Sequence, residues 1–190
     1  QNWPVDAIVA ENGAVGLQHF AGQGLRKLYQ QSAATRQHNR VRLQQVAKRI
    51  LNQVQDSCLS QDSTGRETDI AIDHSEFNHL PQSAIDQVLG IMHSEGMTAT
   101  VSSIHVNGWF GEHSKLTGAR WIVQELWGRD LEAEIDRWVY VGDSTNDQVM
   151  FEHFPHSVGV ANILRFAAQL THPPRYITPS ERGAGFSELD

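Results

Sequence analysis

Residues 139–150 read VYVGDSTNDQVM, a short apolar run followed at once by acidic, amide and hydroxyl side chains. This pattern is typical of a buried strand that turns into a helix, where Asp143 or Ser144 is a suitable N-cap. The position also suits a ligand, because ligands of open α/β sheets bind beyond the carboxyl ends of the strands. Asp143 and Asp147 offer hard oxygen atoms and Asn146 a neutral amide, which predicts a Mg²⁺ site.

The strands predicted around this stretch are too apolar to alternate, and helical patterns separate them. Strands are expected at 138–141, 157–161 and 176–178, and helices at 114–127, 145–154 and 163–170. This order indicates a parallel sheet covered on both faces. A further strand is expected at 5–10. The fold class is therefore α/β.

The middle of the chain has a different pattern, with polar residues alternating in its strands. Its expected elements are a polar helical segment at about 22–56, a strand at 67–74, a helix at 81–94 and a β-pattern at 98–110 broken at Gly108. We therefore predict an α+β insertion at 20–107. The core would be formed by 1–19 and 108–190.

Composition excludes several classes of function. The 190 residues are 39% hydrophobic and 19% charged, as in an ordinary globular protein. The net charge of −7, without a basic run, argues against nucleic-acid binding, and no apolar run approaches the roughly 20 residues of a membrane span. The single cysteine, Cys58, makes the cytoplasm the expected compartment. The start at Gln1, directly before a predicted strand, indicates a cut N-terminus. A homo-oligomer is compatible with the sequence.

Three ordered motifs and two closing segments resemble those of one enzyme family. They are ENGA at 11–14, SK at 114–115, GDSTND at 142–147, SVGVAN at 157–162 and GAGF at 183–186. The chain resembles the haloacid dehalogenase (HAD) superfamily in its Cof-type, or IIB, branch. Within that branch it is most similar to the sucrose-phosphatase-like and mannosyl-3-phosphoglycerate-phosphatase-like proteins.

This resemblance implies a Rossmann-like core with an inserted α+β cap. It also implies a Mg²⁺-dependent phosphatase of small phosphorylated metabolites, with sugar phosphates as the favoured substrates. Lys115 and Asp143 would be catalytic, with Lys115 neutralising the nucleophile and the transferring phosphoryl group. Asn12, Lys115 and Asn146 would bind the substrate or its phosphate. Asp143 and Asp147 would hold the metal.

Four polar residues of the predicted insertion have two interpretations. Asp69 and Asp73 alternate on one strand face, as do His105 and Asn107 on another. Solvent-facing strand residues are the first interpretation. The second comes from the resemblance, since the cap of this family supplies contacts to the substrate.

The family's aspartate nucleophile stands in a DxD motif on a central strand, and a Ser/Thr motif follows on the next strand. Neither occurs in these 190 residues. The core is therefore expected to be incomplete, without its first strands, and this chain alone to be inactive. The alternative is a non-catalytic HAD-like protein that binds a ligand. A nucleotide-binding Rossmann module is disfavoured because no GxGxxG follows a strand.

Overall fold

The computed structural model of the chain describes residues 5–20 and 24–189. It divides into two compact units, Gln1–Ile122 and Val123–Asp190, and each is described by itself. Within the described residues, no helix is both long and apolar enough to cross a bilayer.

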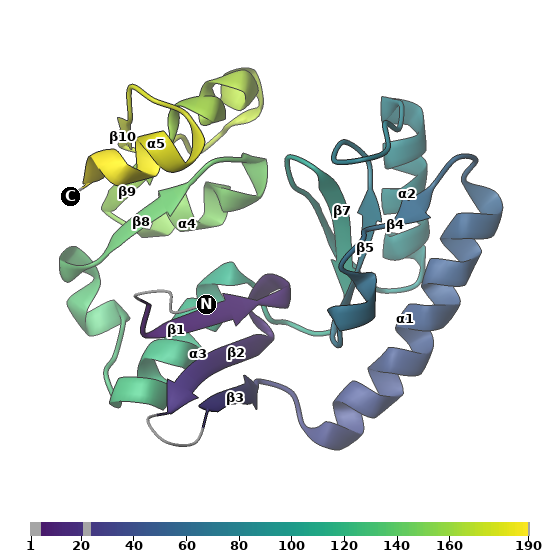
Figure 1. The fold of residues 1–190 in the computed structure, drawn as a ribbon, viewed down its shortest axis with the longest axis horizontal. Coiled ribbons are helices and arrows are strands. Elements are labelled where there is room, and N and C mark those ends of the chain that lie inside the picture. The colour runs from purple at the N-terminus through teal and green to yellow at the C-terminus, as the bar shows by residue number, and fades with distance from the viewer. Residues whose placement is uncertain (1–4, 21–23, 190) are drawn as a thin grey trace. The chain divides into compact units, whose positions relative to one another are not determined.

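The first unit begins with a three-stranded antiparallel sheet in the order β1-β2-β3 (Figure 1). Its strands are β1 (Ala7–Ala10), β2 (Val15–Phe20) and β3 (Gly24–Tyr29). The strand expected at 5–10 is confirmed as β1. The short 3-10 turn η1 (Glu11–Gly13) joins it to β2.

The polar helical segment predicted from about residue 22 is wrong over residues 24–29, which form β3 and pair with β2. The start of that prediction at residue 22 lies outside the described residues. The side chains of β3 are mostly exposed, so the strand has no apolar face to distinguish it from a helix, and the pairing with β2 decides its conformation. Helix α1 (Ala33–Gln53) begins only after Ser32, whose hydroxyl accepts the N–H of Thr35 at 3.1 Å.

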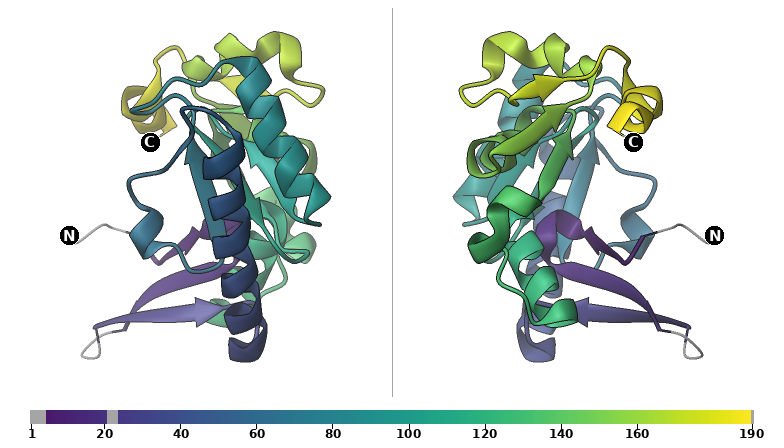
Figure 2. Two further views of the ribbon diagram at one scale, coloured as in Figure 1. Left: turned by 90° about the vertical axis from the view of Figure 1, so that its right-hand side faces the viewer. Right: turned by 90° about the vertical axis from the view of Figure 1, so that its left-hand side faces the viewer.

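A second, four-stranded antiparallel sheet follows, in the order β4-β5-β7-β6. Its strands are β4 (Cys58–Leu59), β5 (Asp69–Asp73), β6 (Thr98–Val101) and β7 (His105–Trp109). Helices α1 and α2 (Gln82–Ser94) lie on one face of this sheet (Figures 1 and 2). Ile72 and Val106 belong to the apolar core between the sheet and these two helices. Burial of each such side chain contributes about 1.5–3 kcal/mol to the stability of the fold.

The break predicted at Gly108 lies instead at residues 102–104, and Gly108 is inside β7. The Ser102 hydroxyl accepts the N–H of His105 at 3.0 Å, which fixes the turn between β6 and β7. Gly108 serves close packing: a Cβ there would lie 2.6 Å from the sulfur of Met92. The predicted division into a core and an insertion stays a prediction, although β3 shares the sheet of the N-terminal strands.

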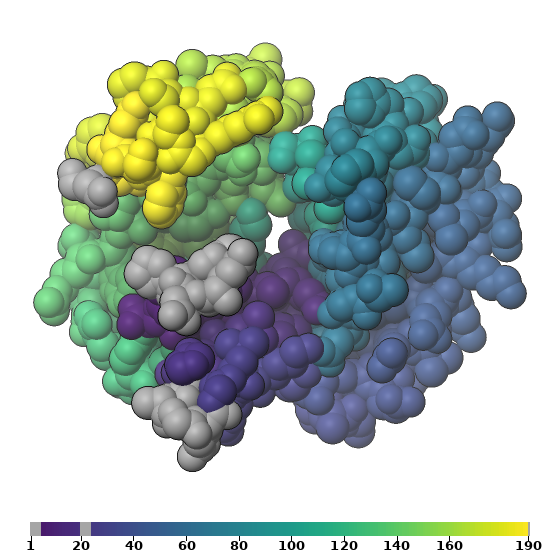
Figure 3. All heavy atoms as spheres, in the orientation of Figure 1, coloured from purple at the N-terminus to yellow at the C-terminus, as the bar shows by residue number. Residues whose placement is uncertain are grey.

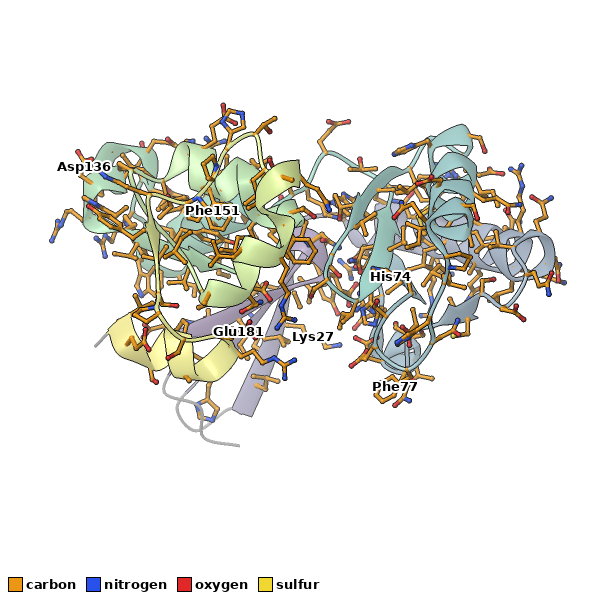
Figure 4. The ribbon with its side chains drawn as sticks, turned by 90° about the horizontal axis from the view of Figure 1, so that it is seen from above. Lys27, His74, Phe77, Asp136, Phe151 and Glu181 are labelled. Carbon is orange, nitrogen blue, oxygen red and sulfur yellow. The ribbon has the colours of Figure 1, made fainter. Side chains whose placement is uncertain are left out.

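The second unit holds a parallel sheet in the order β10-β9-β8, as the apolar strand pattern predicted. Its strands are β8 (Val139–Gly142), β9 (His156–Gly159) and β10 (Tyr176–Ile177). Its α-helices are α4 (Gln148–His153) and α5 (Arg182–Phe186). Tyr140 of β8 packs its ring against Phe151 and Phe154, with ring centroids 5.7 and 5.6 Å away (Figure 4 labels Phe151). The remaining 3-10 segments of the chain are η2 (Ser63–Gly65), η3 (Glu132–Arg137), η4 (Thr145–Asp147), η5 (Ala161–Gln169) and η6 (Ser187–Leu189).

Two glycines let the turn after β1 meet helix α3 (Lys115–Trp127). A Cβ on Gly118 would lie 2.5 Å from the Cα of Gly13, and a Cβ on Gly13 would lie 2.1 Å from the carbonyl oxygen of Ser114. Gly13 also has a φ of 104°, a backbone angle that residues with a side chain rarely adopt. The ENGA and SK motifs, about 100 residues apart in sequence, are therefore in direct backbone contact.

We expect Gly118→Ala to lower the free energy of unfolding by about 1–3 kcal/mol, because the methyl group would force the turn and α3 apart. The matched control is Gly90→Ala in α2, where a Cβ meets nothing within 4 Å. That change should raise stability by about 0.5–1 kcal/mol, since alanine favours helix. Urea unfolding of both variants measures this. A Gly118→Ala protein as stable as the control variant would contradict the packing described.

Candidate functional site

Asp143 follows β8 directly, at the carboxyl end of a parallel strand. Its carboxylate oxygen Oδ2 accepts a hydrogen bond from Nδ2 of Asn162 at 3.0 Å. Asn162 is itself buried, and its Oδ1 accepts the backbone N–H of Arg182 at 3.1 Å. Asn162 therefore holds one side of the Asp143 carboxylate in place. The sequence pattern SVGVAN contained Asn162 but gave no reason to single it out.

Asp147 anchors the backbone of the same turn. Its buried carboxylate accepts the N–H of Asp143 at 2.9 Å and of Ser144 at 3.1 Å on Oδ2, and the hydroxyl of Tyr140 at 2.5 Å on Oδ1. Burial and the neighbouring Asp147 carboxylate raise the pKa of Tyr140, which keeps this hydroxyl a donor. A Cβ on Gly142 would lie 2.7 Å from the same carboxylate, so only glycine fits there.

These contacts divide the roles within GDSTND. The N-cap function considered for Ser144 is confirmed, because Ser144 and Asp147 form a capping box at the start of η4. The amide oxygen of Asn146 accepts the Ser144 hydroxyl at 2.7 Å. Both oxygens of Asp147 are engaged by protein donors, so its direct binding of a metal stays a prediction. The backbone N–H groups of Asp143 and Ser144 donate to the Asp147 carboxylate and not to that of Asp143.

The donor set at this turn fits Mg²⁺ better than a metal that needs a full protein cage. Nowhere in residues 5–20 and 24–189 do three or more His, Cys, Asp or Glu side chains gather as a metal cluster. Mg²⁺ usually takes one or two carboxylates and keeps waters and phosphate oxygens as its other ligands. Asp143, fixed by Asn162, supplies such a carboxylate.

In the first unit, the turn after β1 is held in an unusual conformation. Glu11, Asn12 and Gly13 have φ of 51°, 55° and 104°, three consecutive residues in the left-handed region. The Glu11 carboxylate accepts the N–H of Glu67 at 3.0 Å, and the N–H and hydroxyl of Thr68 at 2.5 and 2.6 Å. Glu11 was predicted only as part of the ENGA turn, but its carboxylate fixes that turn.

Asn12 and Asp69, two residues singled out from the sequence, are brought together. Asn12 Nδ2 donates to Oδ2 of Asp69 at 2.9 Å, and Nη1 of Arg66 lies 3.0 Å from both Asp69 oxygens. Arg66 also binds Asp62, with Nη2 donating at 2.9 Å. Burial raises the pKa of Asp69 to about 6, although Arg66 and Asn12 favour its charged form. Arg66 was not predicted as a site residue, because no local sequence pattern distinguishes it.

A further pair of contacts ties β3 to the same segment. Lys27 forms an ion pair with Glu67, and the Tyr29 hydroxyl donates to the other Glu67 oxygen at 2.9 Å (Figure 4 labels Lys27). Residues 67–69 therefore form bonds with both the η1 turn and β3. Glu11, Asn12, Arg66, Thr68 and Asp69 are joined by these hydrogen bonds, and we call them the turn clasp.

The interpretation of four insertion residues as solvent-facing is wrong. Asp69, Asp73, His105 and Asn107 are all buried, and the strand register places them on the sheet face opposite α1 and α2. These polar side chains can be buried because protein groups form the hydrogen bonds that water would otherwise form with them. Asp73, for example, accepts the N–H groups of the loop that follows it, from residues 75, 76 and 77 at 3.1, 2.9 and 3.0 Å.

Asp73 therefore shapes the loop 74–80. Burial alone would raise the pKa of Asp73, but the backbone N–H groups hold it below its ordinary value. His105 Nε2 lies 2.9 Å from Oε2 of Glu76 in the same loop, and Phe77 at its tip is 65% exposed (Figure 4). Whether these four polar residues contact a substrate stays a prediction.

Lys115 opens α3, as expected from the SK motif. Ser114 and Thr117 cap the helix reciprocally, with bonds of 2.8 Å from the Ser114 N–H and 3.2 Å to its hydroxyl. Lys115 and Asn12 belong to the first unit, and Asp143, Asn146 and Asp147 belong to the second. The assignment of Lys115 and Asp143 to one catalytic site stays a prediction.

Comparison with known proteins gives a likeness in structure alone. No protein-family model matches the chain, and no curated protein matches it in sequence. The sucrose-phosphatase of Synechocystis, solved with sucrose and phosphate, aligns with a TM-score of 0.64 and 16% identity over 98% of this chain and 73% of that chain. A Thermoplasma acidophilum protein aligns with a TM-score of 0.67 and 14% identity over 98% and 72%.

A HAD subclass IIB sugar phosphatase aligns with a TM-score of 0.63 and 13% identity over 97% of this chain and 74% of that chain. At these identities the likeness shows a shared fold. The chain therefore has the α/β fold of the HAD subclass IIB structures, with a Rossmann-like core that is incomplete relative to them. The fold class predicted from the sequence is confirmed.

The pKa of Asp69 generates a prediction about stability. The folded protein takes up a proton near pH 6 and the unfolded chain near pH 3.8, so protonation of Asp69 favours the folded state. Its contribution is fully present below pH 3.8 and is lost as pH rises through 6. The loss amounts to about 3 kcal/mol, from a difference of about two pH units.

Urea unfolding of the wild type and of Asp69→Asn at several pH values between 4 and 7.5 measures this loss. The isosteric amide does not titrate, so the variant should gain stability relative to the wild type as pH rises from about 4 to 6. Asp136→Asn, an exposed position, is the control and should show no such trend. Parallel pH profiles of wild type and Asp69→Asn would refute the raised pKa.

Proposed function

We propose that this chain carries the metal-binding and phosphate-binding residues of a HAD-type, Mg²⁺-dependent phosphatase of small phosphorylated metabolites. Sugar phosphates are the favoured substrates. The observation that carries the proposal is the Asp143 carboxylate. It stands at the carboxyl end of β8, fixed by buried Asn162 and left unused by the backbone of its own turn. It does so in a fold shared with sucrose-phosphatase and other sugar-phosphatase structures.

Each residue of the proposed site has a chemical role. Bound Mg²⁺, held by Asp143, would neutralise charge on the phosphate oxygens. Lys115 places a cation at a helix N-terminus, where the helix dipole disfavours it, which fits a residue that faces an anion. Asn146 and Asn12 would orient the phosphate and the substrate. Asp147 fixes the turn that presents Asp143.

We propose that the sugar part of the substrate binds at the face of the four-stranded sheet opposite α1 and α2. Asp69, Asp73 and His105 each bind protein groups there, which leaves Asn107 as the better candidate to bind hydroxyl groups. The sucrose-phosphatase structure contains sucrose and phosphate, and that likeness supports a sugar phosphate here. The exposed, unpaired Cys58 fits the cytoplasm as the proposed compartment.

The chain contains no DxD motif, so it supplies no aspartate for a phosphoryl-enzyme intermediate. We propose that this polypeptide alone is inactive and that the activity belongs to a form with such a segment. The alternative is a non-catalytic protein that uses the same residues to bind a ligand. A DxDxT strand in the upstream gene sequence would support the enzyme.

Magnesium binding is the first part of the test. Titration of the ¹⁵N-labelled chain with MgCl₂ should shift the backbone amides of residues 142–147 in a saturable way. Asp143→Asn should abolish these shifts, because it removes the carboxylate that we assign to the ion. Asp136→Asn, exposed and in the same unit, is the matched control (Figure 4). Equal shifts in wild type and Asp143→Asn would contradict the metal site.

Turnover is the second part. The 190-residue chain should release no phosphate from sugar phosphates with Mg²⁺, and the chain joined to an upstream DxD segment should release it. In the joined form, Lys115→Ala should lower kcat by at least about 100-fold, in the range found for electrostatic groups of active sites. Lys48→Ala, an exposed lysine of α1, controls for loss of charge. A joined form that binds Mg²⁺ without turnover would favour the non-catalytic alternative.

A further inference from the structure

A cavity of about 250 Å³ lies between α1 and the segment from β4 to β5, within the first unit. On the face drawn in Figure 3, atoms of this segment lie against those of α1. The cavity has a simple geometric cause. Helix α1 has 21 residues and is about 31 Å long, whereas the edge strand β4 has only two residues and leaves part of the helix uncovered.

The floor of the cavity is apolar. Leu43 and Ala47 of α1 form one side, and Leu59 and Ile70 of the neighbouring strands form the other. Leu43 and Ala47 are buried, and Leu59 and Ile70 are half-buried. A ligand with an apolar body would displace water from these surfaces, which contributes about 25 cal/mol per Å² of apolar area.

The rim is polar, and many of its groups already have partners. Arg66 binds Asp62 and Asp69, the Glu67 carboxylate binds Lys27 and Tyr29, and the Ser63 hydroxyl donates to the backbone.

Three rim groups differ from these. Arg40, Gln44 and Thr64 line the cavity and are exposed, and within the described part of the chain none has a side-chain bond or an ion pair. Each can donate a hydrogen bond, and Arg40 brings a full positive charge. A guanidinium binds a carboxylate with two parallel hydrogen bonds.

We propose that this cavity binds a small organic carboxylate with an apolar body, whose carboxylate pairs with Arg40 and whose body lies over Leu43, Ala47 and Ile70. The volume of 250 Å³ equals that of about eight water molecules, which suits a ring-sized acid. The site differs from the proposed phosphatase site, and the proposal does not depend on that function.

The cavity wall connects this site to the turn clasp. Arg66 and Asp69 line the cavity, and Asp69 also accepts the side-chain N–H of Asn12. Glu67 lines it as well, and its N–H binds the Glu11 carboxylate. A ligand that contacts this wall therefore lies one hydrogen bond from the strained turn. Occupation of the cavity should be detectable at Asn12.

The test uses the ¹⁵N-labelled chain and sodium benzoate as the probe, with benzamide as its neutral analogue of the same shape. Benzoate should cause saturable shifts in the amides of residues 40–47 and 63–70, with a dissociation constant on the order of 1 mM, as expected of a fragment-sized ligand. Benzamide should bind at least about 5-fold more weakly because it lacks the charge that pairs with Arg40. The side-chain amide signals of Asn12 should shift along with those of the cavity.

Arg40→Gln should weaken benzoate binding to the level of benzamide. Lys48→Gln removes a charge from α1 two turns further on, outside the cavity, and should leave benzoate binding unchanged. Equal affinity for benzoate and benzamide, or benzoate binding insensitive to Arg40→Gln, would overturn the carboxylate site. Saturable binding without any shift at Asn12 would overturn the connection to the turn. Neither result bears on the Mg²⁺ titration, so failure here and failure of the proposed function are distinguishable.

Discussion

The carboxylate of Glu11 fixes the turn between β1 and β2 in the first unit. It accepts the N–H groups of Glu67 and Thr68 and the Thr68 hydroxyl, and so holds a turn whose three residues all have positive φ. A non-glycine residue in such a conformation costs about 1–3 kcal/mol, and hydrogen bonds to a charged group contribute about 1.5–3 kcal/mol each. The bonds of Glu11 are therefore sufficient to offset the strain. With the turn fixed, Gly13 can approach Gly118 and Asn12 can reach Asp69.

The second unit uses a carboxylate for the same purpose. Asp147 binds two backbone N–H groups and the Tyr140 hydroxyl, whereas within residues 5–20 and 24–189 the Asp143 carboxylate is hydrogen-bonded by Asn162 alone. In each unit a buried or half-buried acid fixes a turn, and a neighbouring polar residue is presented by that turn. The neighbours, Asn12 and Asp143, are the residues to which we assign contacts with substrate and metal. The acids that fix the turns act as positioning residues.

The sequence predicted those features that depend on local pattern. The parallel strands β8, β9 and β10 were predicted because buried strands appear as continuous apolar runs, and α3 was predicted from the helical pattern at 114–127. Strand β3 was missed because it is polar, and only its pairing with β2 makes it a strand. The burial of Asp69 was misjudged because its partners, Arg66 and Asn12, include one that lies 57 residues away. Long-range partners of this kind leave no periodic signal in the chain.

We conclude that the Glu11 carboxylate holds the turn against residues 67 and 68, and amide hydrogen exchange measures this contact. In the wild type, the amides of Glu67 and Thr68 should exchange slowly, because the Glu11 carboxylate accepts both. In Glu11→Ala, both should exchange at least about 10-fold faster, while the amides of β8 in the other unit keep their rates. Wild-type rates at Glu67 and Thr68 equal to those of an unprotected peptide, or rates unchanged in Glu11→Ala, would contradict the claim.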